Sequence, residues 1–383
     1  MKMLSKYEGM RPYRDSEIPV AMKRIAESEA FPFLASFTFP DRSLDEVKAL
    51  LGRIRTCRDF QVEVMWYVND QIKKRSISDF KVSGVNWLEK GRPYLFVSNH
   101  RDIMLDASLL QNVLYDNDMP TCQITFGSNL MSSQLVVDVG RANKMFRVER
   151  PGKLSMKAFY EKSLLLSNYI RDTLTVNGES VWIAQRNGRT KDGDDRTDQG
   201  LVRMLAMSAE GPGSLVDLNI VPIAISYEWE PCDFMKAWEV YLRMTHGDYV
   251  KKPGEDMESV LSGIRSFKGE VNLCICKPIM EEEVAKAWQS PKGMRARAVA
   301  DIMDMRIHGA YVLTPNNFIA HDLLHGVRRW AGLEYDEGEE ADFMAHLKHL
   351  ADFKPENPEL LKNIYLGIYA KPVDNHIPAI AQK

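Results

Sequence analysis

The 383-residue sequence contains no long apolar run. No stretch approaches the roughly 18 consecutive apolar residues that a helix needs to cross a bilayer. The first residues, from Met1 to Glu8, also lack the apolar core of a secretion signal. Both absences lead us to expect that any contact with a membrane is peripheral and that the protein resides in the cytoplasm.

Cysteine is scarce, and its pattern does not suggest pairing. The chain has five cysteines, an odd number, and no Cys-x-x-Cys motif. We therefore expect reduced, packed thiols in a reducing compartment. The formal net charge of -3 gives no overall attraction for nucleic acid, so no nucleic-acid partner is expected.

Several catalytic signatures are missing as well. The sequence has no Gly-x-Ser-x-Gly elbow, no phosphate loop of the Gly-Lys-Ser/Thr type and no dinucleotide fingerprint. His321 and His325, and likewise His346 and His349, are spaced as two metal ligands on one helix face could be. The first pair lacks the glutamate of a zinc peptidase, so surface or capping roles are expected and no metal site is predicted.

The apolar pattern divides the chain into three regions. Residues 1–85 and 281–383 repeat apolar residues at helical spacing, whereas 86–280 alternates short apolar runs with helical segments. The alternation favours an α/β fold with a mostly parallel central sheet, flanked by helices and by helical N- and C-terminal regions. The expected strands are 94–98, 122–126, 145–149, 180–184, 220–227 and 271–276.

The first block of interest is 94–106, where an apolar strand ends in Ser-Asn-His and an acid precedes a helical segment. In an open α/β sheet, ligands bind at the carboxyl ends of strands, which is where His100 would lie. A carboxylate from Asp106, or alternatively from Asp102, could orient the ring as a general base. On a straight helix His100 and Asp106 would point roughly 140° apart, so the histidine must lie on the turn before the helix.

Two basic blocks follow. Residues 140–150 form a strand with three arginines and a lysine, among which Arg150 is the predicted ligand for a phosphate or carboxylate. Residues 180–193 form a second strand that runs into Gln-Arg-Asn-Gly-Arg. Gly188 would permit a tight turn, and Arg186 and Arg189 would surround it with positive charge.

The fourth block, 219–228, is an apolar strand with a proline at position 222. Two interpretations remain open for it. The strand either lines a pocket for an acyl chain or is buried without touching a substrate.

In this order, the four blocks resemble the motifs of the glycerolipid acyltransferases, the glycerol-3-phosphate and lysophosphatidate acyltransferases. The resemblance covers about 86–280 and implies that His100 is the base, that Asp106 orients it, and that 186–189 bind the acceptor. Two departures stand out. The family's H-x4-D motif is H-x5-D here, and Asn187 occupies a position where the family has glutamate.

The resemblance further implies transfer of a fatty acyl group from acyl-carrier protein or coenzyme A to glycerol-3-phosphate or a lysophosphatidate-like acceptor, without a cofactor. Such an enzyme would work peripherally on the inner face of the cytoplasmic membrane. Two alternatives are an N-acyl amino acid as acceptor, and a lipid-binding protein on an acyltransferase scaffold that has lost catalysis.

Overall fold

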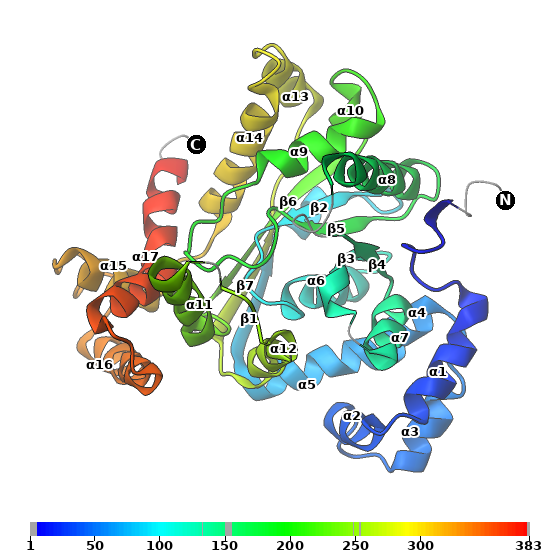
Figure 1. The fold of residues 1–383 in the computed structure, drawn as a ribbon, viewed down its shortest axis with the longest axis horizontal. Helices are drawn as coiled ribbons and strands as arrows, with labels where there is room; N and C mark the ends of the chain where they lie inside the picture. The colour runs from blue at the N-terminus through cyan, green and yellow to red at the C-terminus, as the bar shows by residue number, and fades with distance from the viewer. Residues whose placement is uncertain (1–5, 132, 150–154, 248, 253, 381–383) are drawn as a thin grey trace.

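The computed structural model describes residues 6–131, 133–149, 155–247, 249–252 and 254–380. Within them lies a seven-stranded sheet in the order β1-β7-β6-β2-β5-β3-β4 (Figure 1). The strands are β1 (Ile77–Ser83), β2 (Leu95–Ser98), β3 (Gln123–Gly127), β4 (Met145–Val148), β5 (Val181–Ala184), β6 (Ile220–Tyr227) and β7 (Gly269–Ile275). Strands β2 to β6 are parallel, while β7 is antiparallel to β6 and parallel to β1. The predicted α/β class with a mostly parallel sheet is confirmed.

The middle of the sheet is buried on both faces, as expected for parallel strands covered by helices. Every residue of β2 and β6 is buried. Leu95 and Val97 pack into the core formed with α8, α9, α13 and α14, whereas Phe96 packs into the core formed with α5 and α6. The alternation of side chains along β2 therefore supplies both layers.

Helices form the two layers and both ends of the molecule (Figure 1). The N-terminal helices are α1 (Ile18–Ala26), α2 (Phe31–Thr38), α3 (Leu44–Leu51), α4 (Cys57–Phe60) and α5 (Trp66–Ser76). Between the strands lie α6 (Leu105–Asp116), α7 (Gln134–Ala142), α8 (Met156–Thr175), α9 (Gln199–Leu205), α10 (Gly213–Val216), α11 (Asp233–His246) and α12 (Glu255–Arg265). The C-terminal helices are α13 (Glu281–Trp288), α14 (Arg295–Ala310), α15 (Pro315–His325), α16 (Glu337–Leu347) and α17 (Pro358–Ile380). None of the helices in the described ranges is long and apolar enough to cross a membrane.

One strand lies where the sequence pattern predicted helix. The expected helical region 1–85 ends in β1, which belongs to the same sheet as the six predicted strands. Most of its side chains are exposed, and its two half-buried positions, Ile77 and Phe80, are three residues apart. Because that spacing is also helical, the apolar pattern could not distinguish an edge strand from a helix here.

Candidate active site

The turn between β2 and α6 brings His100 to Asp106. Asp102 caps the helix: its Oδ1 accepts hydrogen bonds from the backbone N–H groups of Met104, at 2.9 Å, and Leu105, at 2.8 Å. His100 lies before this cap and Asp106 in the first helical turn, and His100 Nδ1 is 2.8 Å from Asp106 Oδ2. The extra residue of the H-x5-D spacing is absorbed in the turn. Asp102 bonds the start of α6 through Oδ1 and makes no hydrogen bond to the imidazole, and its Oδ2 has no hydrogen-bond partner in the described chain.

The surroundings of Asp106 determine the tautomer of His100. Asp106 Oδ2 also accepts from the backbone N–H groups of Arg101, at 2.6 Å, and Asp102, at 2.9 Å. Since two backbone donors already make this oxygen an acceptor, the imidazole Nδ1 contacts it as a third donor. Nε2 then carries a lone pair, which is what a general base requires.

The other carboxylate oxygen of Asp106 binds a residue that sequence reasoning had not assigned. Tyr227, at the end of β6, donates its hydroxyl to Asp106 Oδ1 at 2.7 Å. Burial, together with the carboxylates of Asp106 and Asp102, raises the pKa of Tyr227 well above its usual value. The only signal available in the sequence was its position at the end of the fourth block, because this contact joins distant parts of the chain.

The residues on either side of His100 are anchored in the interior. The Asn99 side-chain amide bonds both backbone groups of Ile225 on β6, accepting at 2.8 Å and donating at 2.9 Å. The guanidinium of Arg101 is fully buried and pairs with Asp195 at 2.5 Å and Glu230 at 3.3 Å. Lys236 donates to the Arg101 carbonyl at 2.6 Å and also pairs with Glu230. His100 is therefore held between two fixed neighbours.

The loop after β5 lies against this turn. Thr190 donates its backbone N–H to the His100 carbonyl at 2.7 Å. Gly188 has a φ of +78°, a left-handed conformation that suits glycine, and Asn187 is exposed. Arg186 donates to the Asp194 carbonyl at 2.9 Å and lies 3.4 Å from the carboxylate of Asp192.

Arg189 differs from every other cation near the turn. Its side chain is only 8% exposed, yet it makes no ion pair or side-chain hydrogen bond within the part of the chain that the structure describes, and its Nη1 is buried without a partner. A buried cation without a counter-ion is costly unless a ligand supplies the negative charge. Arg189 is therefore a candidate anion site.

The basic residues of the second block are engaged elsewhere. Arg141 donates to a backbone carbonyl of the N-terminal segment at 3.0 Å, Lys144 to the Thr121 carbonyl at 3.4 Å, and Arg147 to Glu149 at 2.8 Å. None of these three cations lines the cavity next to His100. Arg150, the residue predicted to bind the acceptor, lies outside the described residues.

A cavity of about 1660 Å³ opens beside the turn that carries His100, and His100, Arg186, Gly188 and Arg189 are among the residues that line it. Its apolar walls come mainly from α2, α5, α7, α8 and α12, and include Phe33, Phe37, Val68, Ile72, Val136, Val139, Phe159, Val260, Leu261 and Ile264. No residue of β6 lines the cavity and every residue of the strand is buried, which favours the second interpretation of the fourth block, a buried strand without substrate contact.

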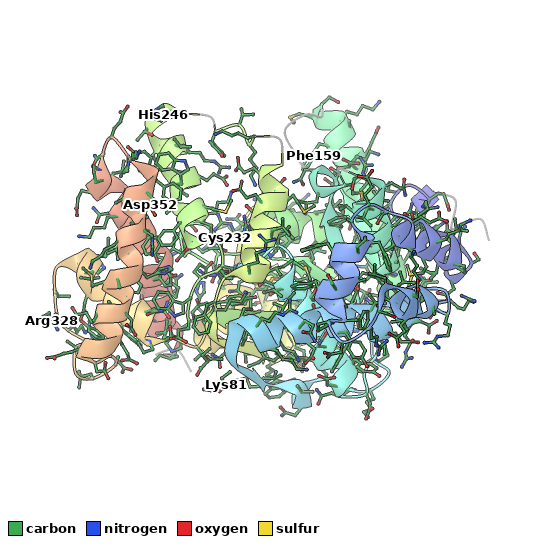
Figure 2. The ribbon with its side chains drawn as sticks, turned by 90° about the horizontal axis from the view of Figure 1, so that it is seen from below. Lys81, Phe159, Cys232, His246, Arg328 and Asp352 are labelled. Atoms are coloured by element: carbon green, nitrogen blue, oxygen red, sulfur yellow. The ribbon has the colours of Figure 1, made fainter. Side chains whose placement is uncertain are left out.

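The rim of the cavity is apolar and exposed. On α8, Met156 is 90% exposed, Tyr160 and Phe159 are also exposed, and all three line the cavity. Phe159 is labelled in Figure 2. Lys191, which also lines the cavity, pairs with Glu239. Burial lowers the pKa of Lys191 to about 8, although Glu239 acts in the opposite direction.

Comparison with known proteins identifies the domain that holds this site. Residues 79–226 match the family model described as Acyltransferase, a span that contains the first three blocks and almost all of β6. Among solved structures, the chain is similar to the 1-acyl-sn-glycerophosphate (LPA) acyltransferase PlsC from Thermotoga maritima. The two are 16% identical with a TM-score of 0.32, over 75% of this chain and 92% of that one. No curated protein matches the chain. The family match agrees with the predicted resemblance: residues 79–226 form an acyltransferase-family domain, which holds the turn of His100 and the loop of Arg189.

Proposed function

We propose that the protein is an O-acyltransferase that moves a fatty acyl group from a thioester of acyl-carrier protein or coenzyme A to a hydroxyl of glycerol-3-phosphate or a lysophosphatidate-like acceptor. One observation carries the proposal. The same cavity is lined by a histidine whose Nδ1 is held by Asp106 and by the buried, unpaired guanidinium of Arg189. A base and an anion site side by side suit an acceptor that carries a hydroxyl and an anionic group.

In this mechanism His100 Nε2 takes the proton of the acceptor hydroxyl while the oxygen attacks the thioester carbonyl. Asp106 stabilises the imidazolium that forms, since its carboxylate is 2.8 Å from Nδ1. The tetrahedral intermediate then expels the thiolate, which receives the proton from His100. The C–S bond breaks, an ester C–O bond forms, and the reaction requires neither a covalent acyl-enzyme nor a cofactor.

The acceptor's anionic group would bind the loop of residues 186–189. Arg189 would supply charge-assisted hydrogen bonds, and Arg186 lies nearby on the same wall. Asn187 is exposed and retains a hydrogen-bonding carbonyl where the family has glutamate. Gly188 adds no side chain, so the backbone of the turn can approach the ligand closely.

The rim of the cavity supports peripheral action at a membrane. Met156, Tyr160 and Met257 are exposed by 90%, 60% and 41%, and all three line the opening. Lys252 adds positive charge beside them, which would attract an anionic lipid surface, whereas Lys251 pairs with Asp256 at 2.6 Å. A lipid acceptor could then enter the cavity from the inner face of the cytoplasmic membrane without crossing water.

Two alternatives share part of this support. A guanidinium binds a carboxylate as well as a phosphate, so an N-acyl amino acid would fit Arg189 by the same chemistry. A lipid-binding protein without catalysis would retain the apolar cavity but would have no need of the His100–Asp106 contact. The close geometry of that contact favours the enzyme.

The test is a mass-spectrometric product assay with the purified full chain. Acyl-carrier protein and coenzyme A thioesters serve as donors, with glycerol-3-phosphate, lysophosphatidate and an N-acyl amino acid as parallel acceptors. We expect a new ester on one phosphate acceptor, reduced roughly 10²- to 10⁴-fold in His100→Ala and unchanged in His349→Ala, whose histidine is exposed on η7 (Lys348–Phe353). An ester only on the amino acid would select the aminolipid alternative. An active, folded His100→Ala protein would refute the proposed base.

A further inference from the structure

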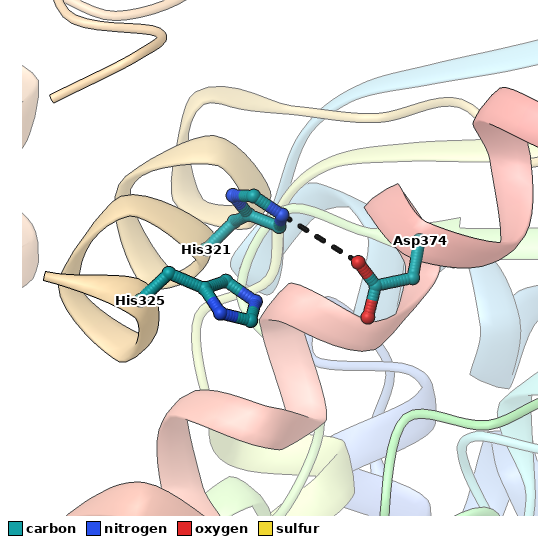
Figure 3. Close-up of side chains that lie close together, drawn as sticks. All are labelled: His321, His325 and Asp374. Carbon is teal, nitrogen blue, oxygen red and sulfur yellow. Dashed lines mark ion pairs between the residues drawn. The ribbon is translucent and has the colours of Figure 1, made fainter. Parts of the chain in front are cut away.

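Two histidines and an aspartate meet between α15 and α17 (Figure 3). His321 and His325 are four residues apart on α15 and therefore lie on the same face of that helix. Asp374 on α17 faces them. One potential ligand atom from each residue lies within 4.8 Å of the other two, and His321 Nε2 is 3.5 Å from Asp374 Oδ1.

These distances suit a tetrahedral metal ion. With zinc–nitrogen bonds of about 2.0–2.1 Å and zinc–oxygen bonds of about 2.0–2.2 Å, two ligand atoms of one tetrahedron lie roughly 3.4 Å apart. The separation of 3.5 Å between His321 Nε2 and Asp374 Oδ1 therefore needs almost no adjustment. His325 and Asp374 are exposed, so small rotations of their side chains can bring the third ligand atom into place.

A buried carboxylate oxygen of Asp322, next to His321, also favours a metal ion here. Asp322 is 1% exposed, and its Oδ2 accepts hydrogen bonds from the Trp330 backbone at 2.9 Å and the Tyr335 hydroxyl at 3.0 Å. Its Oδ1 is buried without a hydrogen bond in the described chain and lies 3.9 Å from His321 Nδ1.

That arrangement matches the outer shell of a metal site. When a histidine binds a metal through one nitrogen, the other nitrogen carries a proton and usually donates it to a carboxylate or carbonyl. His321 bound through Nε2 would turn an Nδ1–H towards Asp322 Oδ1. The weak contact of 3.4 Å from Trp330 Nε1 to Nδ1 would be given up in exchange.

We propose that His321, His325 and Asp374 form a binding site for a divalent transition-metal ion of the zinc class, with Asp322 positioning His321 and water completing the coordination. His325 ends α15, and the negative end of the helix dipole favours a cation there. Lys371, 3.6 Å from Asp374, and Arg329 oppose the metal ion, but the Lys371–Asp374 ion pair is long and open to solvent, and such pairs are weak.

The proposed ion would be structural. None of its three ligands lines the cavity beside His100, so it takes no part in acyl transfer. It would fasten α15 to α17, and α17 touches the loop that carries Arg189: Asn375 donates to Asp194 at 3.1 Å. The metal site is thus independent of the proposed substrate, but it adjoins a helix that contacts the loop carrying Arg189.

The experiment uses the purified full chain after treatment with a chelator. Zn²⁺ binding is measured by calorimetry, Co²⁺ binding by visible absorbance, and the change in melting temperature with each metal is recorded. We expect one ion per chain, a tetrahedral Co²⁺ spectrum and a rise in melting temperature. His325→Ala and Asp374→Asn replace exposed ligands, so both should fold, and each should weaken Zn²⁺ binding at least 10-fold. His349→Ala removes another exposed histidine and should leave the binding unchanged.

Asp322→Asn separates a positioning role from a merely structural one. Loss of an outer-shell carboxylate typically weakens metal binding by about 10- to 100-fold. A purely structural role would lower the melting temperature of the metal-free protein without changing the Zn²⁺ affinity. Zn²⁺ binding that is absent, or equally strong in wild type, His325→Ala and Asp374→Asn, would overturn the site.

Discussion

The two basic blocks look alike in sequence, but their cations have different partners in the structure. In the block at 140–149 every described cation is occupied: Arg141 and Lys144 bind backbone carbonyls, and Arg147 binds Glu149. In the block at 180–193, Arg189 is buried without a partner beside the cavity. A cation can bind a ligand only when the fold places no counter-ion beside it. That depends on distant segments, so a count of arginines in a motif does not reveal it.

The largest effect is expected when a buried cation with known partners is removed. Arg101→Met leaves Asp195 and Glu230 buried with Lys236 as their remaining cation, and should lower the free energy of unfolding by about 3–5 kcal/mol. Arg147→Met removes an exposed ion pair and should change the free energy by less than about 1 kcal/mol. Urea denaturation of both variants measures the contrast. Equal losses would mean that the buried network contributes no more than the exposed pair.

Asp106→Asn tests what the carboxylate adds beyond orientation. The amide oxygen can still accept from the backbone N–H groups of Arg101 and Asp102, so the ring should keep its tautomer. The negative charge that stabilises the imidazolium is lost, and kcat should fall on the order of 10²- to 10³-fold. Steady-state kinetics at saturating acceptor measures this. An unchanged kcat would show that orientation alone suffices.

Arg189→Met tests whether the unpaired cation of the second basic block binds the acceptor. If the unpaired guanidinium binds the acceptor's anion, KM for that acceptor should rise about 10- to 100-fold, the cost of one or two charge-assisted hydrogen bonds. Arg147→Met should leave KM unchanged, since Arg147 does not line the cavity. Kinetics with varied acceptor at fixed donor provide the measurement. A rise of equal size in both variants would contradict the assignment.

The smallest effect concerns Lys268, a fully buried cation with no carboxylate within hydrogen-bonding distance in the described chain. Burial lowers its pKa to about 8, although Asp102 attracts the charge. The unfolded chain binds the proton more tightly, so the destabilisation is present in full below pH 8 and is relieved as the pH rises towards 10.5. Wild type should gain about 1 kcal/mol relative to Lys268→Met between pH 8 and pH 9. Denaturation at both pH values measures this. A stability difference between wild type and Lys268→Met that is the same at pH 8 and pH 9 would refute it.

The sequence predicted the parts of the molecule that depend on local pattern. All six expected strands are present to within a few residues at each end, because each is an apolar run between polar turns. The polar edge strand β1 was missed because its few apolar residues also fit a helix. The placement of His100 on the turn before α6 followed from helix geometry and agrees with its contact to Asp106.

The rest of the site depends on contacts between distant segments. Tyr227 reaches Asp106 from β6, and Asn99 bonds the backbone at Ile225 on the same strand. Neither contact produces a periodic pattern in the sequence. The same is true of Arg189, because only the finished fold shows that no carboxylate among the described residues forms an ion pair with it.

The C-terminal helix gives the protein a dependence on the order of its own synthesis. The Glu230 backbone N–H donates to the Tyr369 hydroxyl at 3.0 Å, and Glu230 pairs with Arg101, the residue after His100. Gly193 packs so closely on α17 that an added Cβ would lie 2.6 Å from the carbonyl oxygens of Gly367 and Ile368. At about 5–20 residues per second, the ribosome needs roughly 13–56 s to pass from His100 to this helix. For that interval a nascent chain has the turn that carries His100 but not the helix that packs against Gly193 and Glu230, so the surroundings of Arg101 are completed only after α17 has been made.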